Sequence, residues 1–180
     1  ERVHFITASL AKAFAGRAGF FTAPASMRYY ILCTSFPNIF SSSLLPHEVA
    51  GLAATLEVIR DSDEARARLH AHTRRLRAAL SELGYPIHQG TEQIIALEVG
   101  LERDTMALRD RLDERGVFGA MFCAPATAAK RAMMRLTLSA GLMASELDHI
   151  EAVAREIAPI VKPWDWPIAR RARAGRALNA

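Results

Sequence analysis

The order of strand-like and helical stretches after residue 92 constrains the fold of this chain more than any other feature. Three stretches have the apolar, period-two composition of β-strands: 93–99, 117–122 and 133–139. Residues 104–115 and 145–161 carry apolar side chains at helical spacing, and Gly116 follows the first of these two stretches. The resulting order, β-α-β-β-α, predicts a compact sheet with helices on one side.

The first part of the chain has a different pattern, with two short strands followed by helices. Strands are expected at 3–8 and 19–23, a helix from Pro24 to about Cys33, and an irregular segment over 36–43. Pro46 begins a further helix whose apolar positions share one face: Val49, Leu52, Ala53, Leu56 and Ile59. Residues 61–63 interrupt this helix and cap a longer one, which stops at Gly84.

These boundaries predict an α/β protein made of two folded parts and a tail. Residues 1–61 form the first part, residues 62–161 form a bridging helix with a smaller α/β domain, and residues 162–180 form a basic tail. Because the chain opens inside a strand that we expect to be buried, we interpret it as the C-terminal part of a longer protein.

The positive charge of the chain lies in the predicted tail. The net charge is +4, and residues 162–180 hold five basic side chains against Asp165 alone. The other 161 residues balance at 18 basic and 18 acidic side chains, so the folded body lacks the basic surface of a nucleic-acid-binding domain. Nucleic acid is therefore not an expected partner. The apolar runs are too short to cross a bilayer, so a membrane is not an expected partner either.

The cysteine and histidine content gives no sign of a metal site. Two cysteines, Cys33 and Cys123, cannot form a disulfide framework or a structural zinc site, so a reducing, cytoplasmic setting is expected. His70 and His72 are two positions apart on a helix and face different directions, which makes them poor joint ligands.

Lys12 is the first candidate for chemistry, because lysine is rare in this chain. Only three lysines stand against 20 arginines, and Lys12 follows a strand among small and apolar residues. An ammonium group is disfavoured in apolar surroundings, and a neutral amine is what imine formation requires. Ser9 precedes it by three residues and could offer a hydroxyl to an anion. A solvent-facing lysine on a loop is the alternative.

Two further sites could bind anionic groups. Ser41 and Ser42 precede the helix that begins at Pro46, where hydroxyl and free N–H groups can bind phosphate; helix capping alone is the alternative. Arg135 lies on the polar side of a strand whose other side is apolar, and its planar guanidinium suits bidentate binding of a carboxylate. An edge-strand arginine with its head in solvent would give the same pattern.

In this order and spacing, three motifs resemble the C-terminal half of the α-oxoamine synthases, pyridoxal-phosphate enzymes with the aspartate-aminotransferase fold. The motifs are TASLAKAF (7–14), FSSSLLP (40–46) and MRLTLSA (134–140), and the resemblance covers about 160 residues. Within this family, the sequence most resembles the branch that makes α-hydroxyketone autoinducers. Two segments carry this resemblance, SLAKAFAGRAG (9–19) and GVFGAMFCAPAT (116–127). Housekeeping members usually carry Gly and His where this chain has Ala11 and Leu142.

The resemblance implies a fold, a cofactor and residue roles. The chain would comprise the end of the large cofactor domain and the small C-terminal domain. Lys12 would be the Schiff-base lysine for pyridoxal 5'-phosphate, Ser9 a ligand of its phosphate, and Ser41 and Ser42 ligands of the phosphate in the partner subunit of a homodimer. Arg135 would bind the carboxylate of the amino-acid substrate.

The reaction implied is a decarboxylating condensation of an acyl-CoA with an amino acid or S-adenosylmethionine, which gives an α-amino ketone. The acidic partner of the pyridine nitrogen and the ring-stacking side chain would lie before Glu1, so we expect the isolated 180 residues to be inactive. A housekeeping synthase of the 8-amino-7-oxononanoate or 2-amino-3-ketobutyrate type is one alternative. A non-catalytic protein whose basic tail binds nucleic acid is the other.

Overall fold

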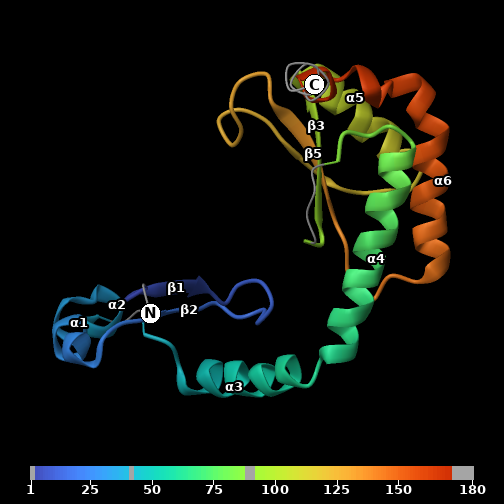
Figure 1. The fold of residues 1–180 in the computed structure, drawn as a ribbon. Coiled ribbons are helices and arrows are strands. Elements are labelled where there is room, and N and C mark those ends of the chain that lie inside the picture. Colours follow the sequence, from blue (N-terminus) through green and yellow to red (C-terminus); the bar gives the residue numbers. More distant parts are fainter. Residues whose placement is uncertain (1–2, 41–42, 88–91, 172–180) are drawn as a thin grey trace. The chain divides into compact units, whose positions relative to one another are not determined.

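The computed structural model describes residues 3–40, 43–87 and 92–171, which divide into two compact units. Unit 1 comprises Glu1–Asp63 and unit 2 comprises Glu64–Ala180. The division falls next to the boundary after residue 61 that the sequence predicts. Helices and strands alternate along the chain, so the predicted α/β class is confirmed (Figure 1).

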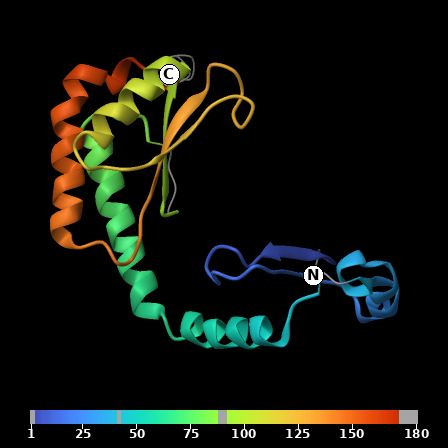
Figure 2. The same cartoon turned by 180° about the vertical axis from the view of Figure 1, so that it is seen from behind.

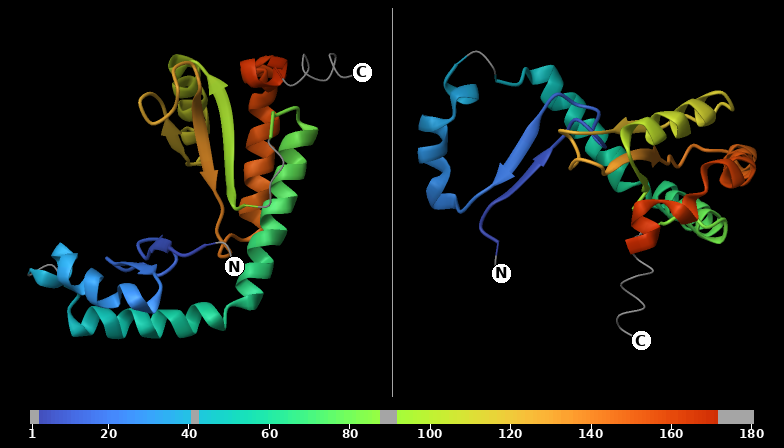
Figure 3. Two further views of the ribbon diagram at one scale, coloured as in Figure 1. Left: turned by 60° about the vertical axis from the view of Figure 1, so that its left-hand side comes forward. Right: turned by 90° about the horizontal axis from the view of Figure 1, so that it is seen from above.

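Unit 1 contains a β-hairpin followed by helices. Strands β1 (Ile6–Ser9) and β2 (Gly19–Thr22) pair antiparallel, with Ser9 opposite Gly19 (Figure 3). The helices are a 3₁₀ turn at Ala25–Met27, α1 (Arg28–Thr34), α2 (Phe36–Ile39) and α3 (Pro46–Arg60). Part of the segment expected to be irregular is therefore helical, because Pro37 stands in the first turn of α2, where its fixed φ favours a helix start.

Side chains in the described part of unit 1 are exposed or half-buried, and none is buried. All four residues of β1 are exposed, so the expectation of a buried first strand is wrong for this structure. Large apolar side chains also face outward, including Tyr29 at 80% and Phe36 at 72% exposure. Unit 1 therefore has a hairpin and helices without a hydrophobic core of its own.

Unit 2 contains the predicted β-α-β-β-α order after a long first helix. Its elements are α4 (Asp63–Glu82), β3 (Ile94–Gly100), α5 (Glu102–Asp113), β4 (Ala120–Phe122), β5 (Ala132–Thr137) and α6 (Ala144–Val161). The sheet order is β3-β5-β4 with antiparallel pairing throughout, so β5 is the central strand. In Figures 1 and 2, α4 and α6 lie side by side along the sheet.

The core of unit 2 lies between one face of this sheet and the three helices. Alternate residues of β3 and β5 enter it, among them Ile95 and Met134, both at 0% exposure. The helices contribute Leu80 from α4, Leu108 from α5 and Ile157 from α6. The prediction of a sheet backed by helices on one side is confirmed for unit 2.

The first part of the predicted tail belongs to the same core. A 3₁₀ turn at Pro163–Asp165 follows α6, and Trp166 and Ile168 are buried at 6% and 7% exposure. The Trp166 indole N–H donates to the Val161 carbonyl at 3.0 Å, and its ring meets Tyr85 edge-on at 5.8 Å. Tail arginines up to Arg171 are thus attached to unit 2; positions 173 and 176 lie outside the described residues.

In the described part of the chain, no helix is both long and apolar enough to cross a membrane.

Candidate functional site

Arg135 projects from the face of the central strand that lies opposite the core. Its neighbours along β5, Met134 and Leu136, are buried in the core, so the period of two sends Arg135 to the other face, as predicted. Its directly paired residues on both sides are alanines, Ala96 on β3 and Ala120 on β4. Both cross-strand neighbours of the arginine side chain are therefore small.

The Arg135 guanidinium is positioned by an aromatic ring and not by a carboxylate. Its Cζ lies 4.5 Å from the centroid of the Phe122 ring, and its Nε is buried without a hydrogen-bond partner. Among residues 3–40, 43–87 and 92–171, none forms an ion pair with it. A buried, unpaired donor on a cation is suited to an anion from outside the chain.

Glu98, the acidic residue on the same face of β3, is occupied by two other arginines. Its side chain is 5% exposed, and it accepts hydrogen bonds from Arg131 at 2.6 Å and from Arg171 at 2.5 Å. The hydrogen bonds from Arg131 lower the pKa of the Glu98 carboxyl below its usual value, and burial opposes them only in part. Glu98 is therefore neutralised locally and leaves Arg135 free for another anion.

Lys12 lies in the turn that joins β1 to β2 in unit 1, and Ser9 is the last residue of β1. The turn is closed by backbone bonds from Leu10 to Ala18 (2.9 Å) and from Gly16 to Leu10 (3.0 Å), and the Ser9 hydroxyl accepts a bond from the Ala11 N–H at 3.2 Å. Lys12 is exposed, so the apolar surroundings expected from its neighbours are not formed by the small side chains of this turn. Its amine is accessible to a reacting group.

The predicted site residues thus divide between the two units. Ser9, at the end of β1, and Lys12, in the turn that follows, belong to unit 1, and Arg135 lies on the sheet of unit 2; each is described within its own unit. Ser41 and Ser42 lie outside the described residues. Neighbouring Ser43 is described, and its hydroxyl donates to the Pro37 carbonyl at 2.8 Å.

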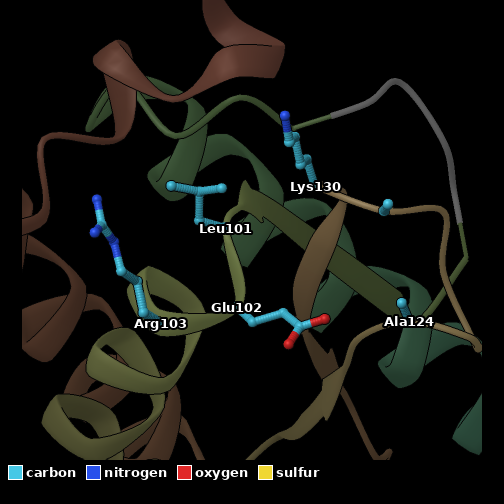
Figure 4. A pocket seen from close by; sticks show the side chains of 6 residues that line it. Leu101, Glu102, Arg103, Ala124 and Lys130 are labelled. Carbon is cyan, nitrogen blue, oxygen red and sulfur yellow. The ribbon is translucent and has the colours of Figure 1, made fainter.

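A pocket of about 580 Å³ opens beside the start of α5 in unit 2. It is lined by Leu101, Glu102, Arg103, Ala124, Ala129 and Lys130. Figure 4 shows that the side chains of Arg103 and Lys130 do not converge on a common point, and Glu102 adds a carboxylate. The two cations therefore do not form a single anion site.

Sequence reasoning missed Phe122 and Glu98. The sequence predicts only that Phe122 ends a strand. Its place on the same face as Arg135 follows once β4 is paired with β5. Glu98 stands in an otherwise apolar stretch, Ile94–Val99, and a charge inside such a stretch was the available signal.

Comparisons with known proteins identify the family of this chain. The model of the family "Aminotransferase class I and II" matches residues 1–153. The CAI-1 autoinducer synthase of Vibrio campbellii is 43% identical over 87% of this chain, and a putative 8-amino-7-oxononanoate synthase of Magnetococcus marinus is 30% identical over 77%. This chain spans only 39% of the length of the first relative and 35% of the second.

Solved structures show the same fold. The serine palmitoyltransferase of Sphingomonas wittichii superposes with a TM-score of 0.80 at 23% identity, and the match covers 89% of this chain and 41% of that one. The 8-amino-7-oxononanoate synthase of Francisella tularensis gives 0.73 at 17% identity, over 86% of this chain and 45% of that one. The chain therefore belongs to the aminotransferase class I and II family, as a relative of its α-oxoamine synthases, and pyridoxal phosphate is the cofactor of that family.

Proposed function

We propose that this chain is the C-terminal part of an acyl-CoA:amino-acid C-acyltransferase that uses pyridoxal phosphate and makes the amino-ketone precursor of an autoinducer. The identity of 43% with the CAI-1 autoinducer synthase supports this choice over the 8-amino-7-oxononanoate synthases, which match at 24–32%. We further propose a cytoplasmic homodimer whose sites are shared between subunits, with Ser41 and Ser42 directed to the partner's cofactor phosphate.

One observation carries the proposal: Arg135 is a half-buried cation with a buried, unpaired Nε and with alanines on both sides. An α-amino acid presents a planar carboxylate, whose negative charge is opposite to that of the guanidinium. Two parallel N–H···O bonds from one guanidinium would fix its orientation, which a point charge cannot do. In the proposal, Arg135 therefore binds and orients the amino-acid substrate.

The residues of the β1–β2 turn fit the cofactor. Lys12 is exposed and forms no ion pair among the described residues, so an aldehyde could reach its amine, and the Ser9 hydroxyl can also donate a bond to phosphate. When bound, pyridoxal phosphate supplies an electron sink that stabilises negative charge at the substrate Cα. Lys12 would hold the cofactor covalently and afterwards move the proton at that carbon.

The condensation then follows from charge and position. Arg135 holds the carboxylate while Cα forms a bond to the thioester carbon of the acyl-CoA. The carbon–sulfur bond breaks and coenzyme A leaves as the thiol after protonation; loss of carbon dioxide, followed by uptake of a proton at Cα, gives the amino ketone. In this proposal Arg135 binds the carboxylate and Lys12 provides the amine; we expect the 180 residues alone to be inactive.

The test is Arg135→Lys in the full-length protein. Lysine keeps the charge but loses the planar two-point contact, so the amino-acid KM should rise about 5- to 150-fold, while the acyl-CoA KM should change little. An unchanged amino-acid KM would refute the carboxylate assignment. A collapsed melting temperature would instead identify Arg135 as a structural residue.

A substrate panel on the same protein tests the autoinducer assignment. Preference for a long-chain acyl-CoA with a C4 amino acid or S-adenosylmethionine supports it. Preference for pimeloyl-CoA with alanine, or for acetyl-CoA with glycine, would assign the protein to a housekeeping reaction.

A further inference from the structure

Phe122 lies diagonally across the β4–β5 ladder from Arg135. In the register Ala120 pairs with Arg135 and Phe122 pairs with Met133, so Phe122 and Arg135 share a face and are one diagonal step apart. Diagonal neighbours in a sheet are within reach when the side chains are long or aromatic. The observed contact between the guanidinium carbon and the ring centroid, 4.5 Å, is within the range of a cation–π interaction.

The remaining surroundings of Arg135 cannot orient its guanidinium. Ala96 and Ala120 are too small to contact its head, and Glu98 is held by Arg131 and Arg171. Within the described residues, the Phe122 ring is the one specific contact to the charged head. An arginine without this contact would sample many rotamers, and that conformational entropy would be lost when a carboxylate binds.

We propose that Phe122 is a positioning residue for Arg135, and this inference rests on the proposed function. The guanidinium carbon lies 4.5 Å from the ring centroid, so the ring attracts the charge without neutralising it. Among the described residues no acidic side chain pairs with the guanidinium, and its Nε has no hydrogen-bond partner, so no carboxylate of the chain occupies its N–H groups. An acidic partner would hold the arginine equally well but would compete with the substrate, whereas an aromatic ring does not.

The inference is tested with Phe122→Leu, Phe122→Met and Phe122→Tyr in the full-length holoenzyme. The first two keep an apolar side chain without a ring, and the third keeps the ring. The amino-acid KM, and the Kd of 2-aminobutyrate without acyl-CoA, should rise roughly 3- to 20-fold for leucine and methionine. Tyrosine should restore both constants to near the wild-type values. The acyl-CoA KM should stay unchanged in all three.

A double-mutant cycle with Arg135→Met separates positioning from packing. If Phe122 acts through the guanidinium, Phe122→Leu should have no further effect on amino-acid binding once the charge is removed. Phe118→Leu is the matched control, because Phe118 precedes the same strand and is 75% exposed. It should leave both constants unchanged.

The outcomes separate this inference from the proposed function. If Arg135→Met leaves amino-acid binding unchanged, the carboxylate assignment fails, and the role of Phe122 fails with it. If Arg135→Met weakens binding but Phe122→Leu does not, only the role of Phe122 is refuted. An equal effect of Phe122→Leu in both backgrounds would also refute it, because the ring would then act by packing alone.

Discussion

Arg171 donates a hydrogen bond of 2.5 Å to Glu98, a residue 73 positions earlier in the chain. The carboxylate of Glu98 also binds Arg131, which immediately precedes β5. One buried acidic side chain therefore joins the C-terminal segment, the β4–β5 connection and the edge strand β3. A substitution of Glu98 should therefore weaken the attachment of both the C-terminal segment and the β4–β5 connection.

Glu98→Gln should lower the free energy of unfolding by about 1–3 kcal/mol at neutral pH, because glutamine makes weaker, uncharged hydrogen bonds to the two arginines. Chemical denaturation of both proteins measures the difference. Glu82→Gln, at an exposed position in the last turn of α4, is the control and should have little effect. Equal stability of Glu98→Gln and wild type would contradict a structural role for this ion pair.

The same pair predicts a pH dependence. Arg131 and Arg171 lower the pKa of Glu98 in the folded protein below its unfolded value near 4.5. The charged form therefore contributes its full stabilisation above that value and loses it as the pH falls through the lower, folded-state pKa. The stability difference between wild type and Glu98→Gln should be constant from pH 6 to 8 and should shrink below about pH 4.5. If the stability difference between wild type and Glu98→Gln grew as the pH fell, the pKa of Glu98 would not be lowered in the folded protein.

Trp166→Ala should destabilise unit 2 by about 3–5 kcal/mol, as expected when a large buried aromatic side chain is truncated. Trp166→Phe keeps an aromatic ring beside Tyr85 but loses the indole hydrogen bond to Val161 and the volume of the second ring, so its cost should be smaller, about 1–2 kcal/mol. Thermal unfolding of the three proteins gives the order. If Trp166→Ala and wild type had the same melting temperature, the segment that follows α6 would not be part of the core of unit 2.

Gly119→Ala should weaken both stability and amino-acid binding. A Cβ at this position would lie 2.8 Å from the Arg135 carbonyl oxygen and 2.8 Å from Met134 Cε, and the backbone atom can give way only if the strand moves. A cost of about 1–3 kcal/mol is expected, with a raised amino-acid KM because Arg135 is displaced. The control is Gly141→Ala, where the nearest atom is Ser139 Oγ at 3.5 Å. A wild-type amino-acid KM and stability in Gly119→Ala would argue against this close contact between residue 119 and the Arg135 backbone.

Lys12→Ala should abolish the visible absorbance that the full-length protein gains with pyridoxal phosphate. The reason is that the amine at position 12 is the proposed covalent attachment point. Lys130→Ala, on the β4–β5 connection of unit 2, is the control and should keep the absorbance. Reduction with borohydride and peptide mapping identifies the modified lysine; a label on another lysine in the wild-type protein would overturn the assignment.

Unit 2 could be predicted closely from the sequence because its hydrophobic pattern and its burial agree. The helix expected at 145–161 is α6 (Ala144–Val161), and the break between two helices at 61–63 is confirmed by the ends of α3 and α4. The strand expected at 117–122 is shorter, Ala120–Phe122. Composition alone does not reveal where pairing with β5 begins, and Gly119 fits there only because it lacks a Cβ.

Unit 1 was harder to predict because its apolar side chains are exposed. Its two strands, α1 and α3 lie within a few residues of the predicted positions, but α2 lies in a segment expected to be irregular, and the first strand, expected to be buried, is exposed. Lys12 is exposed, which is the alternative that the sequence left open. Apolar composition predicts that a segment prefers burial and does not predict what buries it. For a similar reason, Phe122 could be placed beside Arg135 only after the register of two strands was known.

The alternation along β5 protects the site against misfolding by register shift. If the strand slipped by one residue against its partners, Arg135 would enter the apolar core and Met134 would move to the open face. Such a molecule would bury an unpaired charge and would not be stable. Any chain that completes folding thus presents the arginine outward.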